Sequence, residues 1–141
     1  MREFFDTSVL VAAFRRGHVQ HEPSIRLLAN AEKKHSACAL NTFAEVYATM
    51  TALPVKPLIP PQQVFLFIEE IRQRLTPISL EPAEYYDTIQ KAADHGLTSG
   101  RIYDALLLSC AAKSKAQFIY TWNLKLFHSI APNLAPLIRT P

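Results

Sequence analysis

Three acidic residues of this chain stand among apolar neighbours, where an ionised carboxylate is costly to keep. Asp6 follows Phe4 and Phe5, Glu45 lies between Ala44 and Val46, and Asp104 lies between Tyr103 and Ala105. A buried charge destabilises a fold unless something pairs with it or ligates it. Most other acids of the chain have polar neighbours, which is typical of solvated surface. These three are therefore the candidates for chemistry, with Asn123 as a fourth polar position in a similar setting.

The chemistry that such a group supports depends on its charge. Carboxylates brought together repel one another and raise one another's pKa values unless a cation neutralises them. Oxygen ligands suit a hard divalent ion such as Mg²⁺ or Mn²⁺, and they do not suit zinc. Such an ion orients a water molecule, lowers its pKa and neutralises charge that develops on a phosphate. We therefore expect metal-assisted hydrolysis of a phosphodiester.

Each of these positions also has a purely structural explanation. Asp6 and Asn123 are both suitable N-cap residues for a following helix. Thr42 and Glu45 match the spacing of a capping box, and the helix dipole favours Asp104 in a first helical turn. Capping does not explain why all four polar positions fall at a strand end or at the start of a helix.

The elements that must position these residues alternate along the chain. Short apolar runs predict strands at about 2–6, 36–39, 76–80, 118–121 and 136–139. Helical patterns lie between them, at about 7–15, 21–34, 42–52, 61–75, 82–96 and 103–115, with a single turn near 124–128. Strands separated by helices predict a mainly parallel α/β sheet covered on both faces. Sites in such sheets form at the carboxyl ends of the strands.

Length and composition restrict the class of protein. The chain has 141 residues, 49% hydrophobic and 19% charged, which predicts one ordered domain over residues 1–141. A net charge of +3 permits a polyanionic partner without indicating one. Cys38 and Cys110 are expected to be buried thiols, because their spacing does not suit a zinc site. No signal peptide or membrane-spanning run is visible, so we expect a cytoplasmic protein without a membrane partner.

The ordered set of motifs resembles the PIN-domain nucleases. The motifs are Phe5-Asp6-Thr7-Ser8-Val9-Leu10, Asn41-Thr42-Phe43-Ala44-Glu45-Val46, Ile102-Tyr103-Asp104-Ala105-Leu106 and Tyr120-Thr121-Trp122-Asn123. They span nearly the whole chain, and they are most similar to those of the VapC ribonuclease toxins of bacterial toxin–antitoxin pairs.

The resemblance implies roles for particular residues. Asp6, Glu45 and Asp104 would be the catalytic acids that coordinate Mg²⁺ or Mn²⁺. Thr7 or Ser8 would orient a ligand or water, and Thr121 would support the site from its strand. Asn123 stands where many family members have an aspartate, so the site has one negative charge fewer, and a second tightly held metal is in question.

The same resemblance implies the wider setting of the site. It implies a three-layer αβα sandwich with a five-stranded sheet, a homodimer, a cognate antitoxin and an RNA substrate cut to leave a 5′-phosphate and a 3′-hydroxyl. Candidate contacts to the RNA backbone are Arg15, Arg16, Arg101 and Lys125, each near an expected loop or helix end.

The helix expected at 61–75 carries more apolar surface than one buried face requires. Val64, Ile68, Ile71 and Leu75 lie on its expected core stripe, whereas Phe65, Leu66 and Phe67 extend beyond it. Core packing would explain most of these side chains, and a groove for a partner is the alternative, because large exposed apolar patches tend to be interfaces. In the resembling toxins this region helps to hold the C-terminal segment of the antitoxin.

Two alternatives to a nuclease follow from the same residues. A PIN-like RNA-binding or scaffold domain with weak or no catalysis would fit the loss of an acid at Asn123. Retention of three costly acids argues against it. A phosphatase-like site would need a second aspartate two residues after Asp6, and position 8 is serine.

Overall fold

The computed structural model describes residues 1–141 and contains one five-stranded sheet in which every pair of neighbouring strands is parallel. The strands are β1 (Glu3–Phe5), β2 (Ser36–Ala39), β3 (Thr76–Ile78), β4 (Phe118–Tyr120) and β5 (Ile138–Arg139). Their order across the sheet is β3-β2-β1-β4-β5. The chain therefore builds outward from β1 to β3, and then returns to add β4 and β5 on the other side of β1. The direction reverses between β1 and β4, which is the switch point where ligands bind in sheets of this kind.

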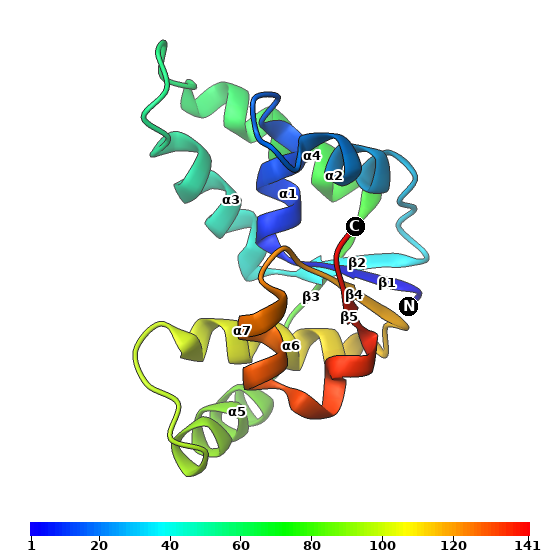
Figure 1. Ribbon diagram of the computed structural model, residues 1–141, viewed down its shortest axis with the longest axis vertical. Helices are drawn as coiled ribbons and strands as arrows, with labels where there is room; N and C mark the ends of the chain where they lie inside the picture. Colours follow the sequence, from blue (N-terminus) through cyan, green and yellow to red (C-terminus); the bar gives the residue numbers. More distant parts are fainter.

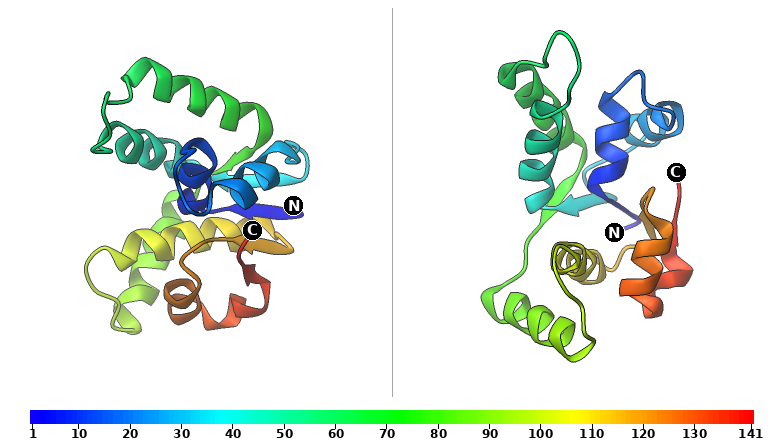
Figure 2. Two further views of the ribbon diagram at one scale, coloured as in Figure 1. Left: turned by 45° about the horizontal axis from the view of Figure 1, so that its top comes forward. Right: turned by 60° about the vertical axis from the view of Figure 1, so that its left-hand side comes forward.

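Helices cover both faces of this sheet. The helices are α1 (Thr7–Phe14), α2 (His21–Ala29), α3 (Asn41–Thr51), α4 (Pro61–Arg74), α5 (Pro82–Asp94), α6 (Arg101–Ser114) and α7 (Leu124–Ile130). Figure 1 shows α1 to α4 on one side of the sheet and α5 to α7 on the other, and both views of Figure 2 agree. The expected three-layer αβα sandwich is confirmed.

Alternation of side chains along the strands gives the protein two cores. Phe4 and Ile119 point into a core that contains the apolar face of α6, whereas Phe5 points to the opposite face, against α1 and α4. Both phenylalanines are fully buried. Because β1 is central and covered on both faces, its two residues before Asp6 are both apolar, without the alternation of a half-exposed strand.

The elements differ from the expected ones mainly at their ends. Helix α2 ends at Ala29, five residues earlier than expected, because the carbonyl of Glu32 accepts hydrogen bonds from His35 and Ser36 and folds the next segment into a turn of its own. Before β5 the chain forms a short 3₁₀ helix, η1 (Pro132–Leu137). Gly96 has a φ of +70°, and this left-handed position after α5 suits a residue without a side chain.

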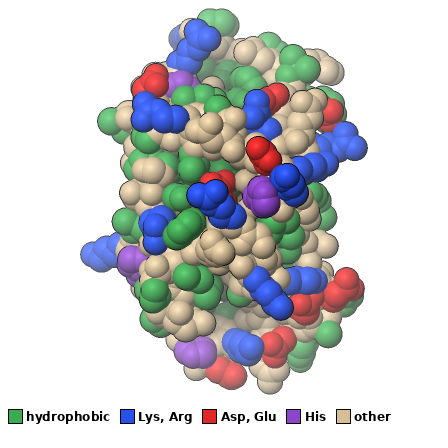
Figure 3. Space-filling view, turned by 90° about the vertical axis from the view of Figure 1, so that its right-hand side faces the viewer, with side chains coloured by type: hydrophobic (Ala, Val, Ile, Leu, Met, Phe, Trp, Pro, Cys, Tyr) green, Lys and Arg blue, Asp and Glu red, His purple; other side chains and the backbone are tan.

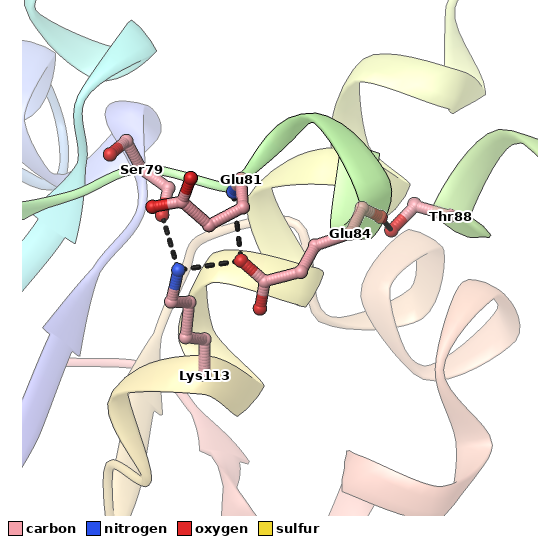
Figure 4. A network of polar contacts seen from close by, with 5 residues as sticks. All are labelled: Ser79, Glu81, Glu84, Thr88 and Lys113. Atoms are coloured by element: carbon pink, nitrogen blue, oxygen red, sulfur yellow. Dashed lines mark hydrogen bonds and ion pairs between the residues drawn. The ribbon is translucent and has the colours of Figure 1, made fainter. Parts of the chain in front are cut away.

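Helix α5 lies at the periphery and is held to α6 largely by polar contacts. Ala92 is its only buried residue. In the network of Figure 4, Lys113 Nζ donates to Glu84 Oε1 at 2.6 Å and to the carbonyl of Ser79 at 3.0 Å. The Thr88 and Ser109 hydroxyls also lie 2.9 Å apart across the two helices. The apolar side chains of α5 are thus left free to face solvent.

Candidate active site

A recess of about 470 Å³ opens at the carboxyl ends of β1 and β4, beside the sheet's switch point. Four of the residues that line it are those singled out from the sequence: Asp6, Glu45, Asp104 and Asn123. They come from four separate places in the chain: the end of β1, α3, α6 and the segment before α7. The parallel topology places these positions at one edge of the sheet.

Asp6 lies deepest, with 4% of its surface exposed. It occupies the N-cap position of α1, but its carboxylate makes no capping hydrogen bond to the helix. Its Oδ2 instead accepts hydrogen bonds from Ser8 Oγ at 2.7 Å and from Thr121 Oγ1 at 2.8 Å. The carboxylate is therefore held by side chains of α1 and of the segment after β4, which capping alone would not require.

The two hydroxyls that hold Asp6 are themselves held by the backbone. Ser8 Oγ accepts the amide N–H of Trp122 at 3.1 Å, and Thr121 Oγ1 accepts the amide N–H of Asn123 at 3.0 Å. Since an amide occupies the acceptor side of each hydroxyl, both hydroxyl protons point to the same carboxylate oxygen. This arrangement fixes the orientation of Asp6 and ties the β4–α7 segment to it.

Glu45 reaches the recess from the second turn of α3. The capping box expected for Thr42 and Glu45 is not formed, because α3 begins at Asn41 and its N-cap position is Leu40. Glu45 Oε1 instead accepts a hydrogen bond from Asn41 Nδ2 at 3.2 Å, and Thr42 is buried. The side chain of Glu45 is thus free of a capping role and half-buried in the recess wall.

The pKa values of all three carboxyl groups are raised from their ordinary values. Burial raises the pKa of Asp6, and the hydroxyls of Ser8 and Thr121 only partly oppose it. Burial also raises the pKa of Glu45, which the charges of Asp6 and Asp104 raise further. For Asp104 the causes are burial and then the charge of Asp6. The recess therefore concentrates negative charge that no neighbouring cation of the chain compensates.

This donor set fits a hard divalent cation. All four predicted side chains offer oxygen atoms, and no lysine or arginine lines the recess. No three His, Cys, Asp or Glu side chains converge closely enough to hold one ion together. The recess therefore suits an ion that keeps part of its water shell, as Mg²⁺ does when one or two carboxylates bind it.

Asn123 occupies the N-cap position of α7, but its side chain makes no capping hydrogen bond. The residue is exposed at the edge of the recess. Its amide oxygen therefore remains free to accept a hydrogen bond or to bind a metal ion, although it contributes no negative charge to the recess.

The four basic residues expected to contact RNA do not line the recess. Arg15 and Arg16 lie just after α1, Arg101 begins α6, and Lys125 lies in α7. Each is close in sequence to a residue of the recess wall, so the expectation that they contact RNA outside it stays a prediction.

On the face with the amino ends of the strands, lysine and arginine side chains are dispersed among other kinds rather than gathered into one patch (Figure 3).

Five further residues of the recess were not predicted from the sequence as site residues, namely Val11, His18, Gln20, Thr49 and Trp122. Helical spacing could have found two of them, since Thr49 lies four residues after Glu45 and Val11 four after Thr7. His18 and Gln20 belong to the loop between α1 and α2, and no periodic pattern in the sequence places a loop.

A second depression adjoins the recess at Glu45. It has a volume of about 530 Å³, and 11 of its 14 lining residues are hydrophobic. It lies between α3, α5 and α6, and Tyr85 and Tyr103 stand exposed beside it. We call this depression, with the exposed face of α5, the α5 surface.

Comparisons with known proteins show which families and folds this chain resembles. The PIN domain family model matches residues 4–131. Ribonuclease VapC40 of Mycobacterium tuberculosis (strain H37Rv) is 31% identical over 114 residues, which cover 81% of each protein. Among solved structures, VapBC2 from Rickettsia felis, bound to a DNA fragment from its promoter, matches with a TM-score of 0.67 at 20% identity, covering 99% of this chain and 98% of that one. Mycobacterium tuberculosis VapC20, a Sarcin-Ricin loop cleaving toxin, matches with a TM-score of 0.71 at 15% identity, covering 90% and 94%.

Proposed function

This chain belongs to the PIN domain family, and we propose that it is a metal-dependent endoribonuclease, the toxin of a VapBC-type toxin–antitoxin pair. One observation carries the proposal: three carboxyl groups with raised pKa values line one recess at the switch point of the sheet. The likeness to a ribonuclease over 81% of the chain supports the same activity. The proposal treats residues 1–141 as a single PIN domain.

Asp6, Glu45 and Asp104 are the proposed metal-binding residues for Mg²⁺ or Mn²⁺: one or two of them would bind the ion directly and the remainder through its water shell, with the amide oxygen of Asn123 beside them. When bound, such an ion lowers the pKa of water and neutralises charge on the phosphate under attack. The residues of the chain supply the geometry. Ser8 and Thr121 fix the carboxylate of Asp6, and the half-buried Glu45 and Asp104 flank it from α3 and α6. Without a cation, three carboxylates would repel the phosphates of RNA.

Arg15, Arg16, Arg101 and Lys125 are proposed to hold the RNA backbone outside the recess. Their charges would partly offset the repulsion by the acids, so binding should weaken as the salt concentration rises. The products would carry a 5′-phosphate and a 3′-hydroxyl.

RNA cleavage is expected to require Mg²⁺ or Mn²⁺ and to stop on addition of a chelator. Asp104→Asn should lower the rate by more than about 100-fold, because loss even of a group that only supports a metal ligand costs 10- to 100-fold. The measurement is hydrolysis of labelled RNA by the purified chain, with Asp94→Asn as the control at an exposed acid of α5. Intact RNA under all divalent ions, or equal rates for the two variants, would exclude the proposal.

We further propose that the antitoxin binds an apolar surface on α4. Phe65 and Leu66 are 52% and 66% exposed, so of the two interpretations of the sequence, core packing does not apply to them. Phe67 is different: it stacks on Phe14 with ring centroids 4.5 Å apart, so it packs α4 against α1 and is only partly exposed. Two large exposed apolar side chains side by side favour a protein interface.

The α5 surface is the proposed homodimer interface. Tyr86 is 71% exposed, and Tyr85, Ile89 and Tyr103 are also exposed. Because α5 is held to α6 largely by polar contacts, its apolar side chains are not needed within the chain (Figure 4). A second copy would cover them and the apolar depression beside them.

The two surfaces are expected to be separable by mutation. Phe65→Glu with Leu66→Glu should abolish co-purification with the product of an adjacent antitoxin reading frame, while the chain stays dimeric. Tyr86→Glu with Ile89→Glu should make the chain monomeric and leave co-purification with the antitoxin unchanged. The reason is that a charge at a buried apolar contact is not tolerated. Light scattering coupled to size-exclusion chromatography measures the oligomeric state. If both pairs of substitutions leave both assemblies intact, the assigned surfaces are wrong.

No helix of the structure combines the length and apolar character needed to cross a bilayer. The proposed activity requires access to RNA, and we therefore propose the cytoplasm as its location.

A further inference from the structure

We propose that His18, in the loop between α1 and α2, binds an RNA phosphate that neighbours the scissile one. The inference rests on the proposed function, since it assigns a further contact to the same substrate. His18 lines the same recess as Asp6, Glu45 and Asp104, although it lies in a different part of the fold. The recess thus extends from the acidic edge of the sheet to this loop.

One ring nitrogen of His18 is already engaged. Nδ1 accepts the backbone N–H of Gln20 at 3.0 Å. An acceptor nitrogen carries no proton, so the neutral imidazole has its proton on Nε2. No group of the chain accepts a hydrogen bond from Nε2. The loop therefore carries an N–H donor that the chain does not use, on a residue that lines the recess.

Two of the other donors of the recess are occupied within the chain. Ser8 Oγ donates to Asp6, and Trp122 Nε1 donates to Ser24 Oγ at 2.8 Å. The walls include no lysine or arginine. A polyanionic strand that enters this acidic recess needs donors for its phosphates. The unused donors of the recess are the side chains of Gln20, Thr49 and Asn123 and the ring N–H of His18. Of these, the His18 ring is the one whose second nitrogen is fixed by the loop backbone, so its orientation is set before RNA binds.

The position of His18 decides which phosphate it meets. Helix α1 begins beside Asp6 and has eight residues, so its far end, where the loop starts, lies about 12 Å from the sheet edge. The backbone N–H of His18 donates to the carbonyl of Arg15 at 2.9 Å, so His18 lies at this far end of α1. This position suits the phosphate of a flanking nucleotide better than the phosphate under attack. It is a substrate-binding residue that takes no part in the chemical step.

Two isosteric substitutions separate this role from a structural one. In His18→Gln, the side-chain amide N–H replaces Nε2–H but the bond to Gln20 is lost. In His18→Asn, the amide oxygen can replace Nδ1 but nothing reaches the recess. The measurement is the steady-state cleavage of a long single-stranded RNA and of a dinucleotide by the Mg²⁺-loaded protein. The control is His35→Asn, at an exposed histidine before β2.

With the long RNA, His18→Asn is expected to raise KM about 10-fold and to leave kcat within about twofold, because a hydrogen bond to a charged group is lost in binding alone. His18→Gln should restore most of the affinity, and the dinucleotide should show no difference between variants. Two results would overturn this inference while the wild type still cleaves RNA. In one, His18→Asn keeps the wild-type KM and His18→Gln does not; in the other, both variants keep the wild-type KM. If the wild type cleaves neither RNA, the proposed function and this inference fall together.

Discussion

Replacing Asp6 with asparagine is expected to abolish RNA cleavage and, at the same time, to raise the free energy of unfolding at neutral pH. Burial raises the pKa of Asp6, so its ionised form is less stable in the folded protein than in the unfolded chain. Asparagine removes the charge, and its oxygen can still accept the hydroxyls of Ser8 and Thr121. The expected gain is roughly 0.5–2 kcal/mol, the usual range for single stabilising replacements.

The pH dependence of this gain has a definite sign. At a pH below the unfolded pKa, the carboxyl is protonated in both the folded and the unfolded state, and its burial carries no cost of charge. Between the unfolded pKa and the raised folded pKa, it is ionised in the unfolded chain but still protonated in the folded protein, and the stability of the fold begins to decrease. The decrease is complete once the pH has risen through the folded pKa. The difference in stability between Asp6→Asn and the wild type should therefore be near zero well below the ordinary pKa of 3.8 and largest above the raised value.

Chemical denaturation at several pH values, together with RNA cleavage, checks both halves of this prediction. Asp94→Asn is the matched control, because that carboxyl is exposed and lies away from the recess. A variant that is inactive and also less stable than the wild type would mean that Asp6 serves the fold as well as the site. Full activity of Asp6→Asn would remove it from the proposed set of ligands.

The gathering of the acids could be predicted because it depends on topology. Asp6 and Asn123 follow neighbouring parallel strands, and such strands end at one edge. The capping box of Thr42 and Glu45 was wrong for a reason that local sequence does not contain. The amide of Leu40 bonds to the carbonyl of Ile78 across the sheet, so α3 starts directly after this strand contact, at Asn41.

Contacts between residues far apart in the chain also determine two features that could not be predicted from the sequence, the packing of Phe67 and the position of the loop that carries His18. Phe67 lies beyond the expected core stripe of its helix, and the sequence left core packing and a partner groove as alternatives. It packs on Phe14, which is 53 residues away in the chain, and no local pattern joins the two. The loop that carries His18 is held by His21, whose Nδ1 lies 2.9 Å from the carbonyl of Ala12. Contacts of this kind form only once α1 and α2 have packed together.

Thr121→Val is expected to lower the free energy of unfolding by about 1.5–3 kcal/mol and to lower the cleavage rate by about 10- to 100-fold. Valine has the shape of threonine and suits a position beside a strand, so packing is preserved. The loss is confined to the hydroxyl, which is fully buried. Without it, Asp6 keeps only Ser8 as a side-chain donor, and the amide of Asn123 loses its acceptor.

Thr121→Ser is the matched control, since it keeps the hydroxyl and removes only a methyl group. It should preserve most of the cleavage rate and lose about 1 kcal/mol of stability. The double variant Asp6→Asn/Thr121→Val tests the cause. If the hydroxyl acts by holding a charged carboxylate, its removal should cost less stability once Asp6 is neutral, because a hydrogen bond to a charged group is the stronger kind. An equal cost in both backgrounds would instead place the role of Thr121 in the Asn123 amide contact alone.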